Sequence, residues 1–142
     1  MSSSTLLLVD DHPLVLQLRR QNLERFGYSV LMASNANSAV SLLEKTPVAV
    51  VLVEYKSEGI DAEAVAHHIK GRFPAQPIVL LSAYSAIPER ILWLVDEYVM
   101  RSDPIETLIK RIERLANPRK TAKARKAAVV ANSSTLPNRF VA

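Results

Sequence analysis

The segment Thr5-Leu6-Leu7-Leu8-Val9-Asp10-Asp11-His12-Pro13 contains the pattern on which the chain is built. A continuous apolar run ends at two acidic residues, and the proline that follows suits the first position of a helix. Apolar runs without polar alternation are typical of strands that are buried on both faces of a parallel sheet. The segment therefore predicts a buried strand, an acidic loop and a helix that begins at Pro13.

The same alternation continues along the chain. The further β-rich runs are Tyr28–Ala33, Val48–Val53, Ile78–Ser82 and Glu97–Met100. The helical segments are Pro13–Phe26, Ala36–Lys45, Ala62–Phe73, a short irregular helix within Ala86–Val95, and a last helix with its apolar stripe from Ile105 to Leu115. Crossovers this short require parallel strands, so the sequence predicts an α/β (βα)₅ domain with helices on both faces of the sheet.

Two helix boundaries carry local signals. Gly27 suits the left-handed residue that ends a helix. Asp103-Pro104-Ile105-Glu106 predicts that Asp103 caps the last helix, with Pro104 at its first position and Glu106 at its third.

The charge divides the chain into two parts. The 142 residues include 18 Lys and Arg against 14 Asp and Glu, a net charge of +4. Residues 117–142 contain six basic and no acidic side chains, which leaves 12 basic and 14 acidic side chains in residues 1–116. We therefore expect a domain at 1–116 and a basic, flexible tail at 117–142, separated by the helix-stopping Asn117-Pro118.

Composition excludes several classes of protein. The absence of cysteine excludes a disulfide scaffold, a thiolate zinc site and a cysteine nucleophile. No segment resembles a signal peptide or a membrane span, so we expect a cytoplasmic protein without a membrane partner. The tail has two interpretations: a solvated linker, or an adaptor that contacts nucleic acid through charge alone. The second is disfavoured because no aromatic side chain lies among its bases before Phe140.

Polar residues follow the predicted strands at one rim. Asp10 and Asp11 follow the first strand, Glu54 the third and Arg101 the fifth, while Ser82 ends the fourth. Ligands of open parallel sheets bind outside the carboxyl ends of the strands, so these side chains are the candidate functional residues. Three acids in one place require a compensating cation.

With these residues at these strand ends, residues 4–116 resemble the receiver domains of bacterial two-component response regulators. The segments that carry the resemblance are the acidic pair in Leu7–Pro13, the strand entry Gly27–Val30, the pair Ser82-Ala83 and the strand Glu97–Arg101. The resemblance implies a doubly wound flavodoxin-like sheet in the order 2-1-3-4-5 and a role in phosphorelay signal transduction. We therefore expect a signalling module and not an enzyme.

The resemblance implies a role for each residue of the site. Asp10, Asp11 and Glu54 are the candidate ligands of a weakly held Mg²⁺, and Glu54 stands at the phosphoacceptor position. Ser82 and Arg101 stand where the family contacts the phosphoryl oxygens, and Tyr98 stands at the switch position. The alternatives from the residues alone remain open: the two aspartates cap a helix, Ser82 is a turn residue and Tyr98 is simply half-buried.

Several of these positions depart from the family pattern. The acceptor is Glu54 instead of Asp, the cation is Arg101 instead of Lys, and Ser102 replaces a proline. Glu is one methylene longer than Asp, and an arginine fork matches a carboxylate, so we expect a Glu54–Arg101 ion pair that substitutes for the phosphorylated state. A drifted site without function and a receiver phosphorylated on Glu54 are the alternatives.

The expected function is that of a stand-alone, atypical receiver that acts by protein–protein interaction. Its expected partner is a histidine kinase or a downstream effector. The expected dimer face is formed by the short helix within Ala86–Val95, the strand Glu97–Met100 and the last helix. In that short helix, the candidate partner surface consists of Ile91, Leu92, Trp93 and Leu94, because a short helix cannot bury all four. The alternative is a helix that is packed on all sides.

Overall fold

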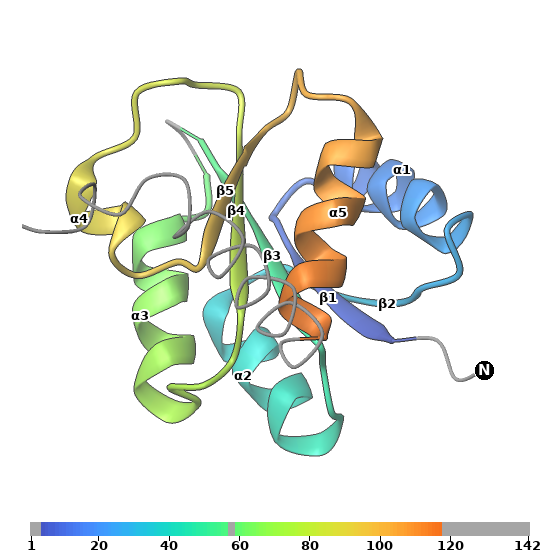
Figure 1. The fold of residues 1–142 in the computed structure, drawn as a ribbon. Coiled ribbons are helices and arrows are strands. Elements are labelled where there is room, and N and C mark those ends of the chain that lie inside the picture. Colours follow the sequence, from blue (N-terminus) through green and yellow to red (C-terminus); the bar gives the residue numbers. More distant parts are fainter. Residues whose placement is uncertain (1–3, 57–58, 118–142) are drawn as a thin grey trace, which may run out of the picture.

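The computed structural model describes residues 4–56 and 59–117. Ten elements alternate along this part of the chain (Figure 1). The strands are β1 (Thr5–Val9), β2 (Ser29–Ala33), β3 (Val50–Tyr55), β4 (Ile78–Ser82) and β5 (Glu97–Met100). The helices are α1 (Pro13–Glu24), α2 (Ala36–Lys45), α3 (Ala62–Arg72), α4 (Glu89–Leu92) and α5 (Ile105–Ala116). The predicted basic tail lies outside the described residues from position 118 onward, so its role stays a prediction.

The strands form one parallel sheet in the order β2-β1-β3-β4-β5. This confirms the predicted doubly wound, flavodoxin-like (βα)₅ fold. The order reverses between β1 and β3, because the chain first moves outward to β2 and then returns past β1. Such a switch point leaves a crevice at the carboxyl ends of the two central strands, which places a site there.

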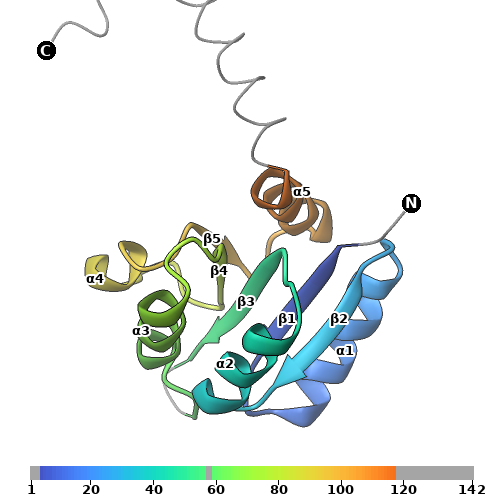
Figure 2. The same ribbon diagram turned by 90° about the horizontal axis from the view of Figure 1, so that it is seen from below.

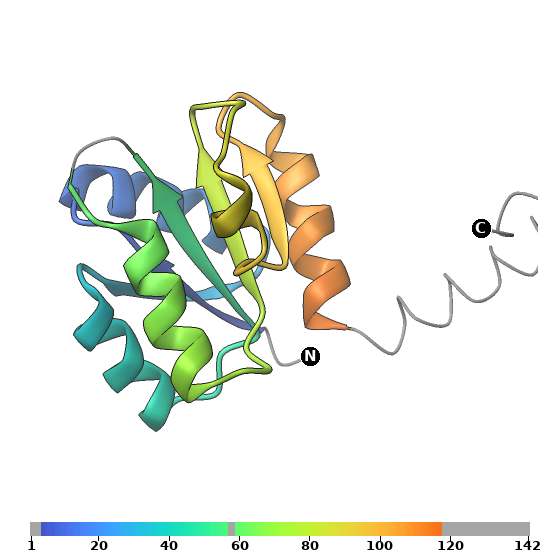
Figure 3. The ribbon, with the colours of Figure 1, turned by 90° about the vertical axis from the view of Figure 1, so that its left-hand side faces the viewer.

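Helices cover both faces of the sheet, with α1 and α5 on one side and α2, α3 and α4 on the other (Figures 2 and 3). Alternate residues of each strand point to opposite faces, so the strands contribute to two apolar clusters. In β3, for example, Val51 and Val53 pack toward α2 and α3, while Val50 and Leu52 pack toward α1 and α5. Glu54 continues the second set, and it therefore projects toward the side of α1.

Strand β3 is longer at its carboxyl end than the sequence predicted. The predicted run ended at Val53, but the ladder with β4 continues through Glu54↔Leu81 and Tyr55↔Ser82. Glu54 is consequently a buried residue inside a strand and not a loop residue beyond it. The difference matters because a carboxylate inside the sheet needs a partner from within the protein.

Two helix signals had different outcomes. Gly27 has φ +91°, so the prediction of a left-handed residue after α1 is confirmed. The prediction that Asp103 caps α5 is wrong, since Pro104 is the N-cap residue and makes no side-chain hydrogen bond. The Asp103 carboxylate instead accepts a hydrogen bond from the Met100 backbone N–H at 3.1 Å, which closes the turn after β5.

Candidate functional site: two ion clusters at the strand ends

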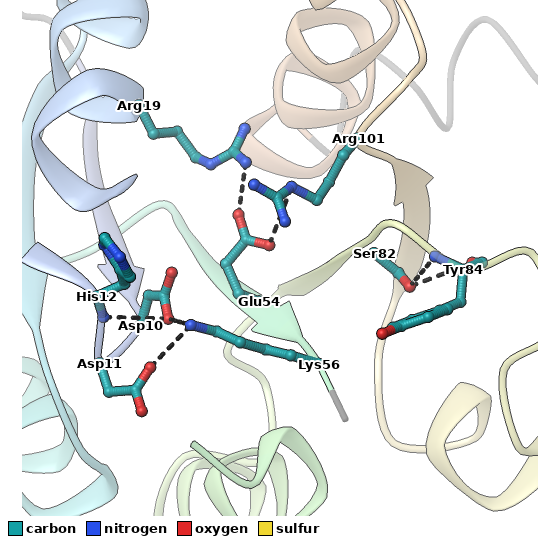
Figure 4. Close-up of polar contacts among 9 residues, drawn as sticks. All are labelled: Asp10, Asp11, His12, Arg19, Glu54, Lys56, Ser82, Tyr84 and Arg101. Atoms are coloured by element: carbon teal, nitrogen blue, oxygen red, sulfur yellow. Dashed lines mark hydrogen bonds and ion pairs between the residues drawn. The ribbon is translucent and has the colours of Figure 1, made fainter. Parts of the chain in front are cut away.

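The predicted residues do converge at the carboxyl ends of the strands. Asp10 and Asp11 follow β1, Glu54 lies near the end of β3, Ser82 ends β4 and Arg101 follows β5. Asp10, Glu54 and Ser82 are buried. Their side chains nevertheless do not form one group. Figure 4 shows three separate sets of contacts, around Glu54, around the aspartates and around Ser82.

Both carboxylate oxygens of Glu54 face arginines (Figure 4). Arg19 Nη2 donates to Glu54 Oε1 at 2.5 Å, and Arg101 Nε lies 3.8 Å from Glu54 Oε2. The expected contact with Arg101 is present, but Arg19 makes the shorter one. The Arg19 side chain is only 18% exposed and that of Arg101 is 44% exposed. Arg19 is therefore the main partner of this buried charge.

Sequence reasoning missed Arg19, although a signal was present. In α1, the apolar residues Leu16 and Leu23 face the sheet, and Arg19 lies between them in the sequence and on the same face of the helix. An arginine on the inward face of a helix indicates a buried acceptor, because its guanidinium needs a hydrogen-bonding partner. Arg19 reaches the site from the middle of α1, so it lies outside the pattern of polar residues at the strand ends.

The aspartate pair has a basic partner of its own, Lys56 (Figure 4). The Lys56 ammonium contacts Asp10 Oδ1 and also donates to Asp11 Oδ1 at 2.8 Å. Sequence reasoning missed this residue too. Lys56 lies just beyond the end of β3, two positions after Glu54, and its long side chain reaches the aspartates that follow β1. One ammonium thus joins the loop after β1 to the end of β3.

The two aspartates do not cap α1. The N-cap residue is His12, whose Nδ1 accepts from the Val15 backbone N–H at 3.4 Å. Asp10 Oδ1 in turn accepts from the His12 backbone N–H at 3.4 Å, so it stabilises the loop before the helix.

The Lys56–Asp11 contact shifts both titrations. The hydrogen bond from Lys56 lowers the pKa of Asp11 below its usual 3.8, against an opposing effect of burial. Burial alone would lower the pKa of Lys56, but its hydrogen bonds to Asp10 and Asp11 outweigh burial, and the pKa of Lys56 rises above 10.5. Folding therefore stabilises the carboxylate form of Asp11 and the ammonium form of Lys56.

These shifts predict how the contribution of Lys56 depends on pH. An acid with a lowered pKa adds stability above its unfolded pKa, and this stability is lost as the pH falls through the folded pKa. A lysine with a raised pKa adds stability below its unfolded pKa and loses it as the pH rises through the folded value. The unfolding free energy of the native chain minus that of Lys56→Met should be constant between about pH 5 and 9 and shrink in stronger acid. Urea unfolding across this range measures it, and a difference unchanged at about pH 3 would contradict the assignment.

Ser82 and Tyr98 meet at the backbone of Tyr84. Ser82 Oγ accepts from the Tyr84 N–H at 2.8 Å and donates to the Tyr84 carbonyl at 3.1 Å. The Tyr98 hydroxyl donates to the same carbonyl oxygen at 2.5 Å. The Arg101 backbone N–H donates to the Ser82 carbonyl at 2.7 Å, which joins β4 to the end of β5. The predicted phosphoryl-contact residue Ser82 and the predicted switch residue Tyr98 therefore share the Tyr84 carbonyl group in the loop after β4.

The residues do not fit a divalent cation held by Asp10, Asp11 and Glu54. The arginines face both oxygens of Glu54, and Lys56 lies between the aspartates. Within the described ranges, no three His, Asp or Glu side chains are grouped so that they could hold a metal ion. Only Asp10 Oδ2 is left as a buried acidic oxygen without a hydrogen-bond partner among the described residues.

The expected partner surface on α4 is only partly exposed. Trp93 is 82% exposed and Leu92 is exposed as well. Ile91 is buried in the core and Leu94 packs against it, so the prediction is wrong for Ile91. The reason is geometric: one turn of helix still turns one side toward the sheet, and Ile91 lies on that side.

The fold and the site together define a doubly wound α/β domain with an acid–base site at the ends of its central strands. The family described as response regulator receiver domain matches residues 6–113. The chain belongs to this family. Receiver domains are signalling modules of two-component systems, and they interact with histidine kinases or effector domains.

Several relatives and solved structures are similar to this chain. The probable transcriptional regulatory protein TcrX of Mycobacterium tuberculosis is 27% identical over 114 residues, which are 78% of this chain and 49% of TcrX. Transcriptional regulatory protein GlrR of Escherichia coli is 30% identical over 86 residues, 61% of this chain and 19% of GlrR. The response regulator TrrA of Thermotoga maritima, solved in complex with Mg²⁺ and BeF, is 28% identical with a TM-score of 0.70, covering 79% of this chain and 98% of TrrA.

The chain thus spans at most about half the length of these curated relatives. Among the described residues, no helix combines the length and the apolar character that crossing a membrane requires.

Proposed function

We propose that this receiver domain is held in one conformation without phosphorylation and acts by protein–protein interaction. The observation that carries the proposal is the buried Glu54 carboxylate with a guanidinium at each oxygen. Arg101 places positive charge where the family neutralises a phosphoryl group, and Arg19 adds a second positive charge at the same carboxylate, so Glu54 is already neutralised without a phosphoryl group.

Phosphorylation of Glu54 would require its carboxylate to attack phosphorus with one free oxygen. In this chain Arg19 binds Oε1, and Arg101 lies beside Oε2. The Ser82 hydroxyl, which would contact the incoming group, already makes two hydrogen bonds to the Tyr84 backbone. A phosphoryl donor would have to break these contacts before transfer could begin.

The contacts of Tyr98 and Arg101 support a single conformation. Tyr98 is partly buried, and its hydroxyl is hydrogen-bonded to the loop after β4. Arg101 belongs to the turn after β5, three residues further on, and lies beside Glu54. Rearrangement of β5 would therefore cost both the tyrosine hydrogen bond and the contact with Glu54.

We also propose that the partner binds at α4 and β5. Leu92 and Trp93 expose apolar surface there, and large aromatic side chains dominate the binding energy of many interfaces. The partner is a histidine kinase or a downstream effector, and a second copy of the chain binding through α4, β5 and α5 is the alternative occupant. A cytoplasmic location stays a prediction.

Acetyl phosphate with Mg²⁺ tests the proposal. Intact mass spectrometry of the treated native chain should show no phosphoryl adduct, and a receiver domain with aspartate at the acceptor position serves as the positive control. An acyl phosphate localised to Glu54 would overturn the proposal and favour a receiver that is phosphorylated at an unusual acceptor.

A further inference from the structure

We infer that the Lys56 ammonium takes the place of the divalent cation of the family, so that Asp10 and Asp11 bind no metal ion in the native chain. The inference goes beyond the proposed function, because a receiver that is never phosphorylated could still bind Mg²⁺ through Asp10 and Asp11. It assigns Lys56 as the residue that prevents such binding.

The first support is geometric. Two adjacent carboxylates, one of them buried, repel each other unless a cation lies between them. The Lys56 ammonium occupies that position, in contact with Oδ1 of both aspartates. A divalent cation coordinated by the same two oxygens would have to displace the ammonium.

The second support is charge balance. The site contains the three acids Asp10, Asp11 and Glu54 and the three bases Arg19, Lys56 and Arg101. Its formal charge is therefore zero before any ion binds. A divalent cation would add two positive charges beside three basic groups, which disfavours binding at short range.

The third support is the direction in which Glu54 points. The family's metal site needs a third carboxylate from β3, but Glu54 turns toward α1 and the turn after β5 (Figure 4). Asp10 and Asp11 alone would have to hold the ion. Removing Lys56 should therefore create a weak two-carboxylate site and not a tight one.

Mn²⁺ binding tests the inference, with the free ion measured by electron paramagnetic resonance. The native chain should show no Mn²⁺ binding up to about 1 mM, and Lys56→Met should bind Mn²⁺ with a dissociation constant at least roughly tenfold below that limit. Lys70→Met is the matched control. Lys70 pairs with Asp96 at 2.9 Å and not with any of the three acids of the site, and its loss changes the net charge by the same amount. This control should bind no better than the native chain.

Three results would overturn the inference: native binding as tight as that of Lys56→Met, binding by neither protein, or equal gains in both variants. Circular dichroism establishes that the variants are folded. If Lys56→Met does not fold, the Mn²⁺ titration of the native chain still tests the inference. Mn²⁺ bound at Asp10 and Asp11 of the native chain would contradict it. Metal binding and the phosphoryl adduct are separate readouts, so either claim can fail alone.

Discussion

Replacing Arg19 with methionine should lower the unfolding free energy by about 3 kcal/mol, because it leaves a buried carboxylate without its main partner. Glu54 is buried in β3, and Arg101 is too exposed and too distant to replace the lost hydrogen bond. Methionine retains an apolar stem like that of arginine, so the lost unfolding free energy measures the contribution of the guanidinium group. Urea unfolding monitored by circular dichroism measures the change.

Two further arginines calibrate this result. Arg101→Met should cost less than about 1 kcal/mol, since the Arg101 side chain is 44% exposed and lies 3.8 Å from Glu54. Arg72→Met removes a contact with Glu44 in which both side chains are exposed, and it should cost no more than about 0.5 kcal/mol. If Arg19→Met proved as mild as Arg72→Met, the Glu54–Arg19 pair would not hold the site together.

The second large effect concerns the core beneath the site. Leu52→Ala should cost about 3 kcal/mol, because Leu52 is fully buried in the central strand β3 and its removal leaves a cavity between the sheet and the α1–α5 layer. Leu14→Ala is the matched control: Leu14 is 69% exposed on α1, and its truncation should change the stability by no more than about 0.5 kcal/mol. Equal losses in the two variants would contradict the packing described for this layer.

Much of the fold could be predicted from the sequence, because hydrophobic runs determine where buried strands lie. The bounds of β1, β4 and β5 agree with the prediction at both ends. The end of β3 was misplaced because Glu54 is polar and was interpreted as the residue after the strand. Backbone pairing with β4 continues regardless of side-chain polarity, and Arg19 satisfies the acid inside the sheet.

The site could be predicted only in part. Strand ends converge by topology, so the placement of Asp10, Glu54 and Ser82 followed from the order of the elements. The partners of these side chains did not follow, because long basic side chains reach the site through several rotatable bonds. Arg19 approaches from a helix and Lys56 bends back from the end of β3. The predicted cluster of five residues is therefore divided into two ion clusters, each with one base that the strand-end pattern did not contain, and a hydrogen-bonded set around Ser82.

We propose that this receiver needs neither a metal ion nor a phosphoryl group to hold its conformation. The most direct test is the ¹H–¹⁵N correlation spectrum of the labelled chain before and after addition of Mg²⁺ and beryllium trifluoride, which mimics a phosphoryl group on a carboxylate. The amide signals of Glu54, Ser82 and Arg101 should keep their positions. Saturable shifts of these three signals on addition of both reagents would contradict the proposal.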